Sequence, residues 1–318
     1  MGGFCAAGRP LTNSLKSFFM NLPRSIRLSL RLPTAFAFFA GGIFAQAQTP
    51  GPDFHDHLGL QLYSLKTQIA ADAAAGLDLA KGYGITEAEL AGTGTVSPAV
   101  FAGLMQARGL NAISDHFDYA RLKRDLPGVI KDAHTLGLQF IILPGMPHPK
   151  TGLDEKSARA AAADFNRWGK ALKAAGIRLG YHTHGFEFRP VGAEGGDTAF
   201  DVFVRATDPE FVCLEMDVYW VYHAGQDPVA WLNKYPTRWK LLHLKDMRRG
   251  APRGGDKPES APKTDMVAIG AGEIDWPAVL TTARSVGVEH YFIEDETANP
   301  LLSIPPSLTY LRGLKLSN

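Results

Sequence analysis

From residue 58 to the C-terminus, short apolar runs alternate with longer segments that follow a helical period. The short runs are five or six residues long and are typical of buried strands; they cover residues 58–63, 86–90, 110–114, 138–143, 177–182, 212–217, 239–244 and 290–294. The longer segments are typical of helices that pack on a sheet; they cover residues 70–82, 98–109, 122–137, 154–176, 198–207, 227–234, 276–286 and 301–314. The pattern predicts eight strand–helix units in one repeating order.

Eight such units predict a parallel α/β fold, and we expect a single-domain (β/α)8 TIM barrel over residues 58–318. The alternative is a doubly wound open sheet, but no Gly-rich phosphate-binding turn follows the first apolar run. Residues 247–265 interrupt the pattern and are rich in Arg, Gly, Pro and Asp. We expect this insertion to be a surface loop or a lid, because strand-to-helix loops surround the active site of a barrel.

The N-terminal region has a different character. Residues 1–47 contain five basic residues and no acidic residue, and an apolar stretch over residues 32–45 precedes the small-x-small sequence Ala45-Gln-Ala47. This order is typical of a secretory signal peptide. We therefore predict a cleaved signal peptide over residues 1–47, with Met20 as an alternative start, and a linker over residues 48–57. The mature protein is expected to be exported, either periplasmic or secreted.

Charge and composition exclude several classes of protein. The chain has 33 basic and 32 acidic residues, so loss of the basic leader leaves a mildly acidic protein. Nucleic-acid binding needs a basic face and is not expected. The mature chain lacks an apolar run of about 18 residues, so stable membrane insertion is not expected either. Cys213 would be the only remaining cysteine, which excludes an intrachain disulfide. The sequence leaves open whether the protein forms a homo-oligomer.

Polar side chains gather at the carboxyl ends of the predicted strands. In a barrel these ends meet at one face and form the active site. Six of the eight ends carry such residues, over Glu89, 115–116, 181–187, 215–217, 243–246 and 294–296. Buried charges are costly unless they are paired or bind a metal. Six convergent polar ends therefore predict a functional site.

Alternation along the strands favours a metal site. Side chains two residues apart share an orientation in a strand; the pairs concerned are His182 with His184, Glu215 with Asp217, and His243 with Lys245. Imidazoles and carboxylates without thiolates suit Mn²⁺, Zn²⁺, Co²⁺ or Fe²⁺. The alternative is a polar cluster held by hydrogen bonds alone.

Several short motifs follow one another in a particular order. They are Glu89–Gly92, Tyr181–Phe188, Asp217–Trp220, Asp227–Trp231, His243–Asp246, Gly270–Trp276 and Ile293–Glu294. In this order the sequence resembles the sugar phosphate isomerase/epimerase group of xylose isomerase-like barrels. The resemblance extends from about Leu58 to the last predicted helix.

The resemblance implies a set of metal ligands at the ends of strands five to eight. Carried over to this sequence, they are His182, Asp217, His243 and Glu294. The epimerases of the group have a glutamate where this chain has His182, and their strand-five and strand-eight glutamates also transfer the protons. One carboxylate of that pair is therefore missing here, so this departure argues against simple two-carboxylate epimerisation.

A divalent ion in such a site would polarise a sugar carbonyl and acidify the neighbouring C–H group. Return of the proton isomerises or epimerises the sugar, whereas loss of a β-substituent is an elimination. We predict a metal-dependent isomerase/epimerase that forms an enediolate from an unphosphorylated keto-sugar, because sugar phosphates are largely cytoplasmic. The alternatives are a 3-keto-glycoside lyase or hydrolase that cleaves by β-elimination, and a non-catalytic sugar-binding barrel.

Individual residues are assigned provisional roles in this small-molecule carbohydrate site. The candidates for proton transfer are Glu294, His184 and Glu187, and Lys245 is expected to stabilise an oxyanion. The expected substrate contacts are Glu89, His116, Gln61, Tyr63 and Trp220.

Overall fold

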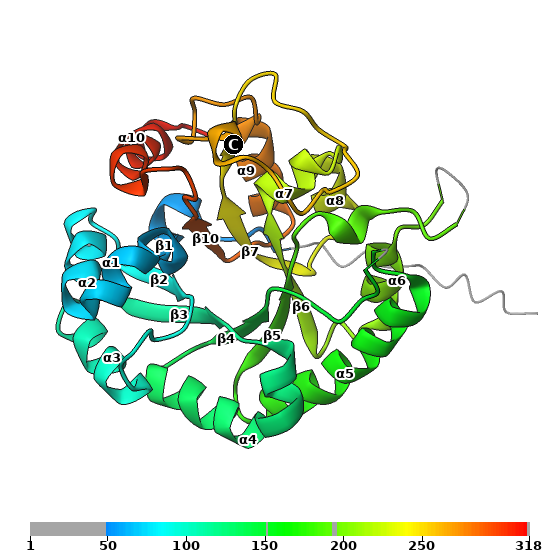
Figure 1. The fold of residues 1–318 in the computed structure, drawn as a ribbon, viewed down its shortest axis with the longest axis horizontal. Coiled ribbons are helices and arrows are strands. Elements are labelled where there is room, and N and C mark those ends of the chain that lie inside the picture. Colours follow the sequence, from blue (N-terminus) through cyan, green and yellow to red (C-terminus); the bar gives the residue numbers. More distant parts are fainter. Residues whose placement is uncertain (1–48, 151, 193–195, 317–318) are drawn as a thin grey trace, which may run out of the picture. The chain divides into compact units, whose positions relative to one another are not determined.

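The computed structural model describes residues 49–150, 152–192 and 196–316. Eight parallel strands close into a barrel in the order β1-β10-β7-β6-β5-β4-β3-β2, which confirms the predicted TIM barrel (Figure 1). These strands are β1 (Leu58–Gln61), β2 (Glu87–Leu90), β3 (Asn111–His116), β4 (Phe140–Leu143), β5 (Arg178–His182), β6 (Val212–Asp217), β7 (Trp239–Leu244) and β10 (His290–Ile293). The predicted signal peptide and Met20 lie outside the described residues.

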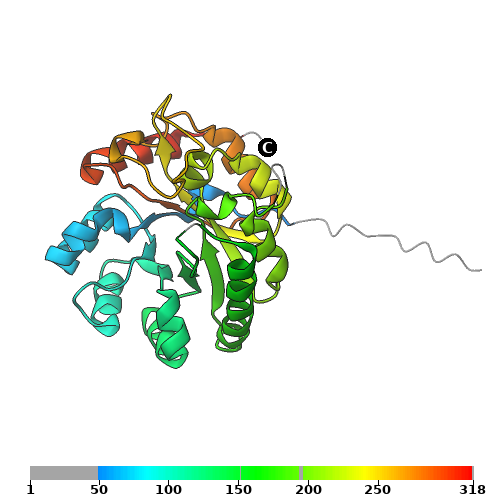
Figure 2. The ribbon, with the colours of Figure 1, turned by 45° about the vertical axis from the view of Figure 1, so that its right-hand side comes forward.

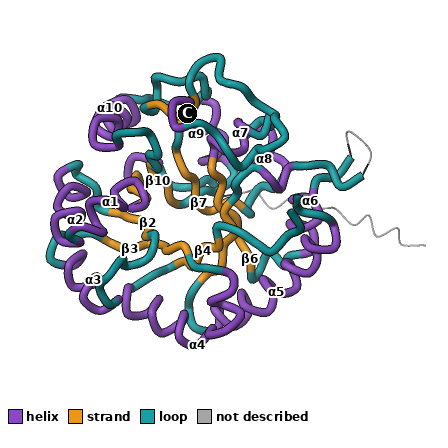
Figure 3. Tube along the Cα trace, viewed as in Figure 1, coloured by secondary structure: helices purple, strands orange, loops and turns teal. Residues whose placement is uncertain are grey.

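Helices surround the strands, as Figures 2 and 3 show. They are α1 (Lys66–Ala71), α2 (Ala73–Gly82), α3 (Pro98–Gln106), α4 (Tyr119–Leu136), α5 (Glu155–Ala174), α6 (Ala199–Ala206), α7 (Val218–His223), α8 (Pro228–Lys234), α9 (Trp276–Ser285) and α10 (Pro300–Gly313). α10 lies beside the C-terminal end of α2. The Arg312 guanidinium of α10 donates to the carbonyl of Tyr83, the residue that follows α2, at 2.8 Å. None of the described helices is long and apolar enough to cross a membrane.

Aspartate caps decide where several helices begin. The Asp72 carboxylate accepts from the backbone N–H groups of Ala74 and Ala75, so one predicted helix is split into α1 and α2. Asp217 likewise accepts from the Trp220 N–H and starts α7, a helix that the sequence pattern did not predict. A cap side chain that satisfies free N–H groups favours a helix start at that position.

The barrel interior has an apolar layer between two polar ends. The residues of this layer are Ile113, Phe140, Ile142, Cys213, Leu241 and Phe292. The Phe292 ring lies 6.4 Å from the His243 ring and 6.3 Å from the His290 ring, measured between centroids. The neighbouring strand β1 leaves room for it, since a Cβ at Gly59 would lie 2.7 Å from the Phe292 ring. Phe292 therefore separates His243, at the carboxyl ends of the strands, from His290, at the amino ends.

The insertion after β7 is held down rather than free of the barrel. It is bracketed by a small antiparallel pair, β8 (Asp246–Met247) and β9 (Met266–Val267). The Arg253 guanidinium lies 3.4 Å from the centre of the Tyr222 ring and donates to the Tyr222 carbonyl at 2.8 Å. The insertion is thus fastened to α7, next to the carboxyl ends of the strands.

A buried carboxylate shapes the Gly270–Trp276 motif. Asp246 accepts from the backbone N–H groups of Gly270, Gly272 and Ile274 and from the Trp276 indole. A Cβ at Gly272 would lie 2.1 Å from an Asp246 carboxylate oxygen, so this position requires glycine. The motif is therefore a scaffold for the β8–β9 region.

Candidate active site

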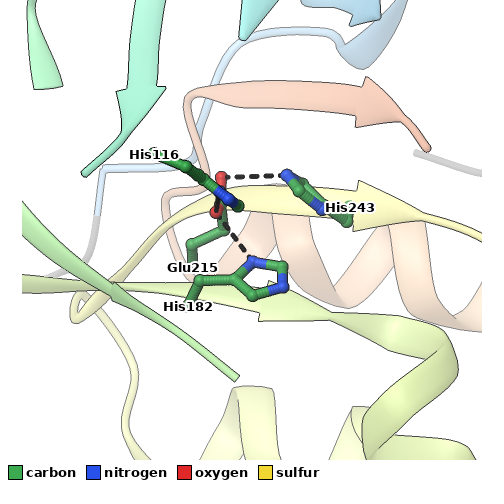
Figure 4. A group of neighbouring side chains, drawn as sticks. All are labelled: His116, His182, Glu215 and His243. Carbon is green, nitrogen blue, oxygen red and sulfur yellow. Dashed lines mark hydrogen bonds and ion pairs between the residues drawn. The ribbon is translucent and has the colours of Figure 1, made fainter. Parts of the chain in front are cut away.

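A cluster of imidazoles and one carboxylate fills the carboxyl end of the barrel. Figure 4 shows His116, His182, Glu215 and His243, which come from β3, β5, β6 and β7. Glu215 Oε2 lies 2.8 Å from His182 Nδ1 and 3.2 Å from His116 Nε2. Glu215 Oε1 lies 3.5 Å from His243 Nε2. Glu215 is therefore the centre of the cluster, although sequence reasoning noted it without giving it a role.

The four residues proposed as metal ligands lie within the same region. His243 Nδ1 is 3.2 Å from Glu294 Oε2, and His182 Nε2 is 3.9 Å from Asp217 Oδ2. Suitable ligand atoms of Asp217, His243 and Glu294 all lie within 4.8 Å of one another. The arrangement brings together the ligand set that the resemblance implied, and it could hold a divalent ion.

The second nitrogen of His243 has its own carboxylate partner. His243 Nε2 lies 2.5 Å from Glu89 Oε1, whereas Nδ1 faces Glu294. A carboxylate on the far nitrogen fixes the orientation of a metal-binding imidazole. Glu89 is therefore placed to position His243.

Glu89 and Gln61, two of the expected substrate contacts, lie beneath the cluster and are not among the residues that line the cavity described below. Both are fully buried, and Gln61 Nε2 donates to Glu89 Oε1 at 2.8 Å. The Ser114 hydroxyl donates to the other oxygen of Glu89 at 2.6 Å. Gln61 and Glu89 are register partners in β1 and β2. The sequence predicted their inward direction but not their depth.

A cavity of about 510 Å³ opens above the cluster. It is lined by Tyr63, Ala91, His116, Pro144, His182, His184, Trp220, Glu294 and Glu296. The structure therefore places Tyr63, His116 and Trp220, three expected substrate contacts, around one space. Two candidates for proton transfer, His184 and Glu294, line it as well.

Two cavity-lining histidines have opposite protonation tendencies. Burial lowers the pKa of His184 to about 4, so its imidazole is neutral near pH 7. Burial also opposes protonation of His116, but the charges of Glu89 and Glu215 outweigh it and raise the pKa to about 10. A neutral imidazole can accept a proton and a charged one can donate it.

The carboxylates of the site also differ. Burial alone would raise the pKa of Glu294, but Lys245 and His243 hold it well below its usual range. Burial raises the pKa of Asp217 to about 6 and that of Glu215 to about 7. One oxygen of each of these last two carboxylates is buried and accepts no hydrogen bond. Asp217 Oδ2 still faces Lys245 Nζ at 3.1 Å, and Glu215 Oε1 lies 3.5 Å from His243 Nε2. A cation would add to this compensation, so the donor set fits a metal ion.

Lys245 lies among the carboxylates of the site, whereas Glu187 lies outside the cavity lining. Lys245 Nζ lies 2.6 Å from Glu294 Oε2 and 3.1 Å from Asp217 Oδ2, and it also bonds Glu296 at 2.6 Å. Glu187 lies outside the cavity lining, and its carboxylate accepts from the Tyr181 hydroxyl at 2.5 Å and the His184 N–H at 2.9 Å. Glu187 therefore supports the turn after β5 from outside the cavity lining.

Comparison with known proteins agrees with the fold. The xylose isomerase-like TIM barrel family model matches residues 71–315. Inosose dehydratase from Lacticaseibacillus casei is 25% identical over an alignment of 190 residues, and the match covers 54% of this chain and 62% of that protein. Inosose dehydratase from Clostridium beijerinckii is 28% identical over 195 residues, with the same coverage of 54% and 62%. The chain thus spans about three fifths of the length of these curated relatives.

A solved structure gives a more complete match. The sugar phosphate isomerase/epimerase from Parabacteroides distasonis superposes with a TM-score of 0.67 and 25% identity. The match covers 82% of this chain and 97% of the other. The named relatives therefore include both dehydratases and an isomerase/epimerase.

Proposed function

The chain belongs to the xylose isomerase-like TIM barrel family, and from this premise we propose that it is a metal-dependent carbohydrate lyase. It would remove a proton next to a carbonyl and expel the substituent on the β-carbon. The observation that carries the proposal is geometric: two imidazoles, His184 and His116, line one cavity beside the cluster of candidate metal ligands. The similarity to inosose dehydratases, which are named for loss of water, supports the same class of reaction.

Asp217, His243 and Glu294, together with His182, would hold the ion. Their nitrogen and oxygen donors suit Mn²⁺, Zn²⁺, Co²⁺ or Fe²⁺, and Glu89 would hold His243 through its other nitrogen. When bound, the ion would polarise a substrate carbonyl and make the neighbouring C–H group more acidic. Lys245 would keep Glu294 ionised through their 2.6 Å contact.

The proton transfers follow from the two imidazoles. His184 takes the proton from the carbon, and the electrons of the broken C–H bond become the new C=C bond as the β C–O bond breaks. His116 gives its proton to the departing oxygen. The products are the unsaturated carbonyl compound and the released water or alcohol, and the two histidines have exchanged protonation states.

We further propose that the substrate is an unphosphorylated keto-sugar or 3-keto-glycoside. Neither Arg nor Lys is among the residues that line the cavity, whereas phosphate sites commonly use such cations. Tyr63 and Trp220 offer aromatic walls on which a sugar ring can pack. Export, expected from the leader sequence, would favour the same choice.

An isomerase or epimerase is the second candidate. The similarity to the Parabacteroides distasonis protein favours it, and so does the position of Glu294 in the cavity lining, where a carboxylate could return a proton to carbon. A non-catalytic sugar-binding barrel would explain the aromatic walls but not the buried charges around Glu215.

Deuterium exchange separates these functions. Metal-loaded wild-type protein would be incubated in D₂O with keto-sugars and 3-keto-glycosides, beside His184→Gln and, as a matched control in the same turn, Glu187→Gln. A lyase gives an unsaturated ketone and a released alcohol or water, both lost in His184→Gln alone. Deuterium in a product of unchanged composition would instead indicate an isomerase or epimerase. Sugar binding without exchange or release would leave the sugar-binding barrel.

A further inference from the structure

A second group of potential ligands lies at the amino end of the barrel. It consists of His57, at the end of the 3-10 helix Phe54–His57, with Glu87 on β2 and His290 on β10. His57 Nδ1 lies 2.9 Å from Glu87 Oε1, and His290 Nδ1 lies 2.7 Å from Glu87 Oε2. We call these three residues the floor cluster.

We propose that the floor cluster is a second site for a divalent metal ion such as Zn²⁺. The bound ion would link the first and last strands of the barrel. Two imidazoles and one carboxylate form a ligand set that zinc uses elsewhere, with water in the fourth position. Suitable ligand atoms of the three residues already lie within 4.8 Å of one another. Each imidazole faces a different oxygen of the same carboxylate, so small side-chain shifts would place an ion among them.

The charges around the floor cluster favour a cation. The described residues supply Glu87 with no Lys or Arg partner, and its ion pairs are with the two imidazoles alone. With neutral imidazoles, the cluster therefore has one net negative charge to offer. Glu87 and His290 are largely buried, but the His57 side chain is 33% exposed. An ion and its water could therefore reach the cluster from solvent.

The position of the floor cluster suggests what the ion would do. β1 follows directly after His57 and pairs with both β2 and β10. The cluster therefore lies where the first and last strands of the barrel pair and close it. An ion that binds only the closed barrel would stabilise it by linkage.

The floor cluster is independent of the candidate active site. Its His290 packs against Phe140, at 5.8 Å between ring centroids, and against Phe292. On its other side Phe292 meets His243 of the active site. Because the apolar layer separates the two ends, removal of ligands at one end should leave the other able to bind.

Zinc stoichiometry tests the proposal without any activity assay. Chelator-treated full-length protein would be titrated with Zn²⁺, followed by elemental analysis of the dialysed protein. We expect two ions on the wild type, one on Asp217→Ala/His243→Ala, one on His57→Ala, and none when the three substitutions are combined. His55→Ala is the matched control, since His55 lies on the same turn but its ring hydrogen-bonds, among the described residues, to Asp53 alone.

Thermal melting provides the second measurement. Zn²⁺ should raise the Tm of Asp217→Ala/His243→Ala, and addition of Glu87→Gln should abolish that shift. Circular dichroism would show that each variant is folded, and the exposed position of His57 keeps at least one floor variant intact. Folded Asp217→Ala/His243→Ala that binds no zinc, or equal binding by the His57→Ala and His55→Ala proteins, would overturn the proposal. A wild-type protein that binds zinc at the floor cluster but not at Asp217 and His243 would instead count against the proposed function.

Discussion

The two polar ends of the barrel solve the problem of buried charge in different ways. At the carboxyl end, Lys245 contacts three carboxylates and Glu215 contacts three imidazoles, and a cavity opens above them. At the amino end, one carboxylate bridges two imidazoles, and no lysine or arginine of the described residues pairs with it. Dense charge beside a cavity is suited to chemistry, whereas the sparse floor cluster is suited to holding the barrel closed.

The largest expected effect comes from removing ligands at the carboxyl end. Asp217→Ala or His243→Ala should lower kcat/KM roughly a thousandfold, because a bound ion is worth several kcal/mol of charge stabilisation. The comparison is His57→Ala, which should retain kcat/KM within about twofold. Equal losses in both variants would show that the two ends are not independent.

The next effect separates proton transfer from metal binding. His184→Gln should lower kcat roughly 10²- to 10⁴-fold, since it removes a general base, while the metal content of the protein stays unchanged. Elemental analysis beside steady-state kinetics measures both quantities. A loss of metal that parallels the loss of kcat would make His184 a ligand instead.

A smaller effect is expected for the carboxylate behind His243. Glu89→Gln should weaken metal affinity or activity about 10- to 100-fold, because Glu89 orients His243 from behind. Ser114→Ala removes only one hydrogen bond to Glu89 and should have a smaller effect. Competition with a chelator would give both affinities, and a stronger effect from Ser114→Ala would contradict the assigned order.

The smallest effect concerns a carboxylate that supports the active site without touching substrate. Burial raises the pKa of Glu187 from 4.5 to about 7. The folded protein therefore holds a proton there that the unfolded chain has released, and stability falls as the pH rises through this range. Glu187→Gln should remove this loss and be more stable than wild type above pH 7, by roughly 1–3 kcal/mol. Denaturant unfolding at pH 5 and pH 8 measures the difference, and equal slopes with pH would contradict it.

The sequence predicted the parts of this fold that depend on local pattern. β6 and β7 begin and end at the expected residues, 212–217 and 239–244, because continuous apolar runs define buried parallel strands. Period-two alternation placed Asp217 and His243 on the inner face. The break at Asp72 was missed, since a cap inside an Ala-rich segment competes weakly with the helical pattern in a linear reading.

The sequence pattern could not predict contacts that form only when the barrel closes. The floor cluster joins residues 57, 87 and 290, which only the register of β1 with β2 and β10 brings together. The depth of Gln61 and Glu89 has the same origin, because alternation gives a direction but not a layer. Asp217 shows a third limit, since the same side chain caps α7 and faces Lys245.

β10 and the residue that follows it carry His290, Phe292 and Glu294 on one inward column. These three residues serve the floor cluster, the apolar layer and the active site in turn. Insertion of a single codon within this strand would turn the residues that follow it to the outer face of the barrel. In a mutational library, this strand should therefore accept many conservative replacements while rejecting nearly every one-residue insertion or deletion.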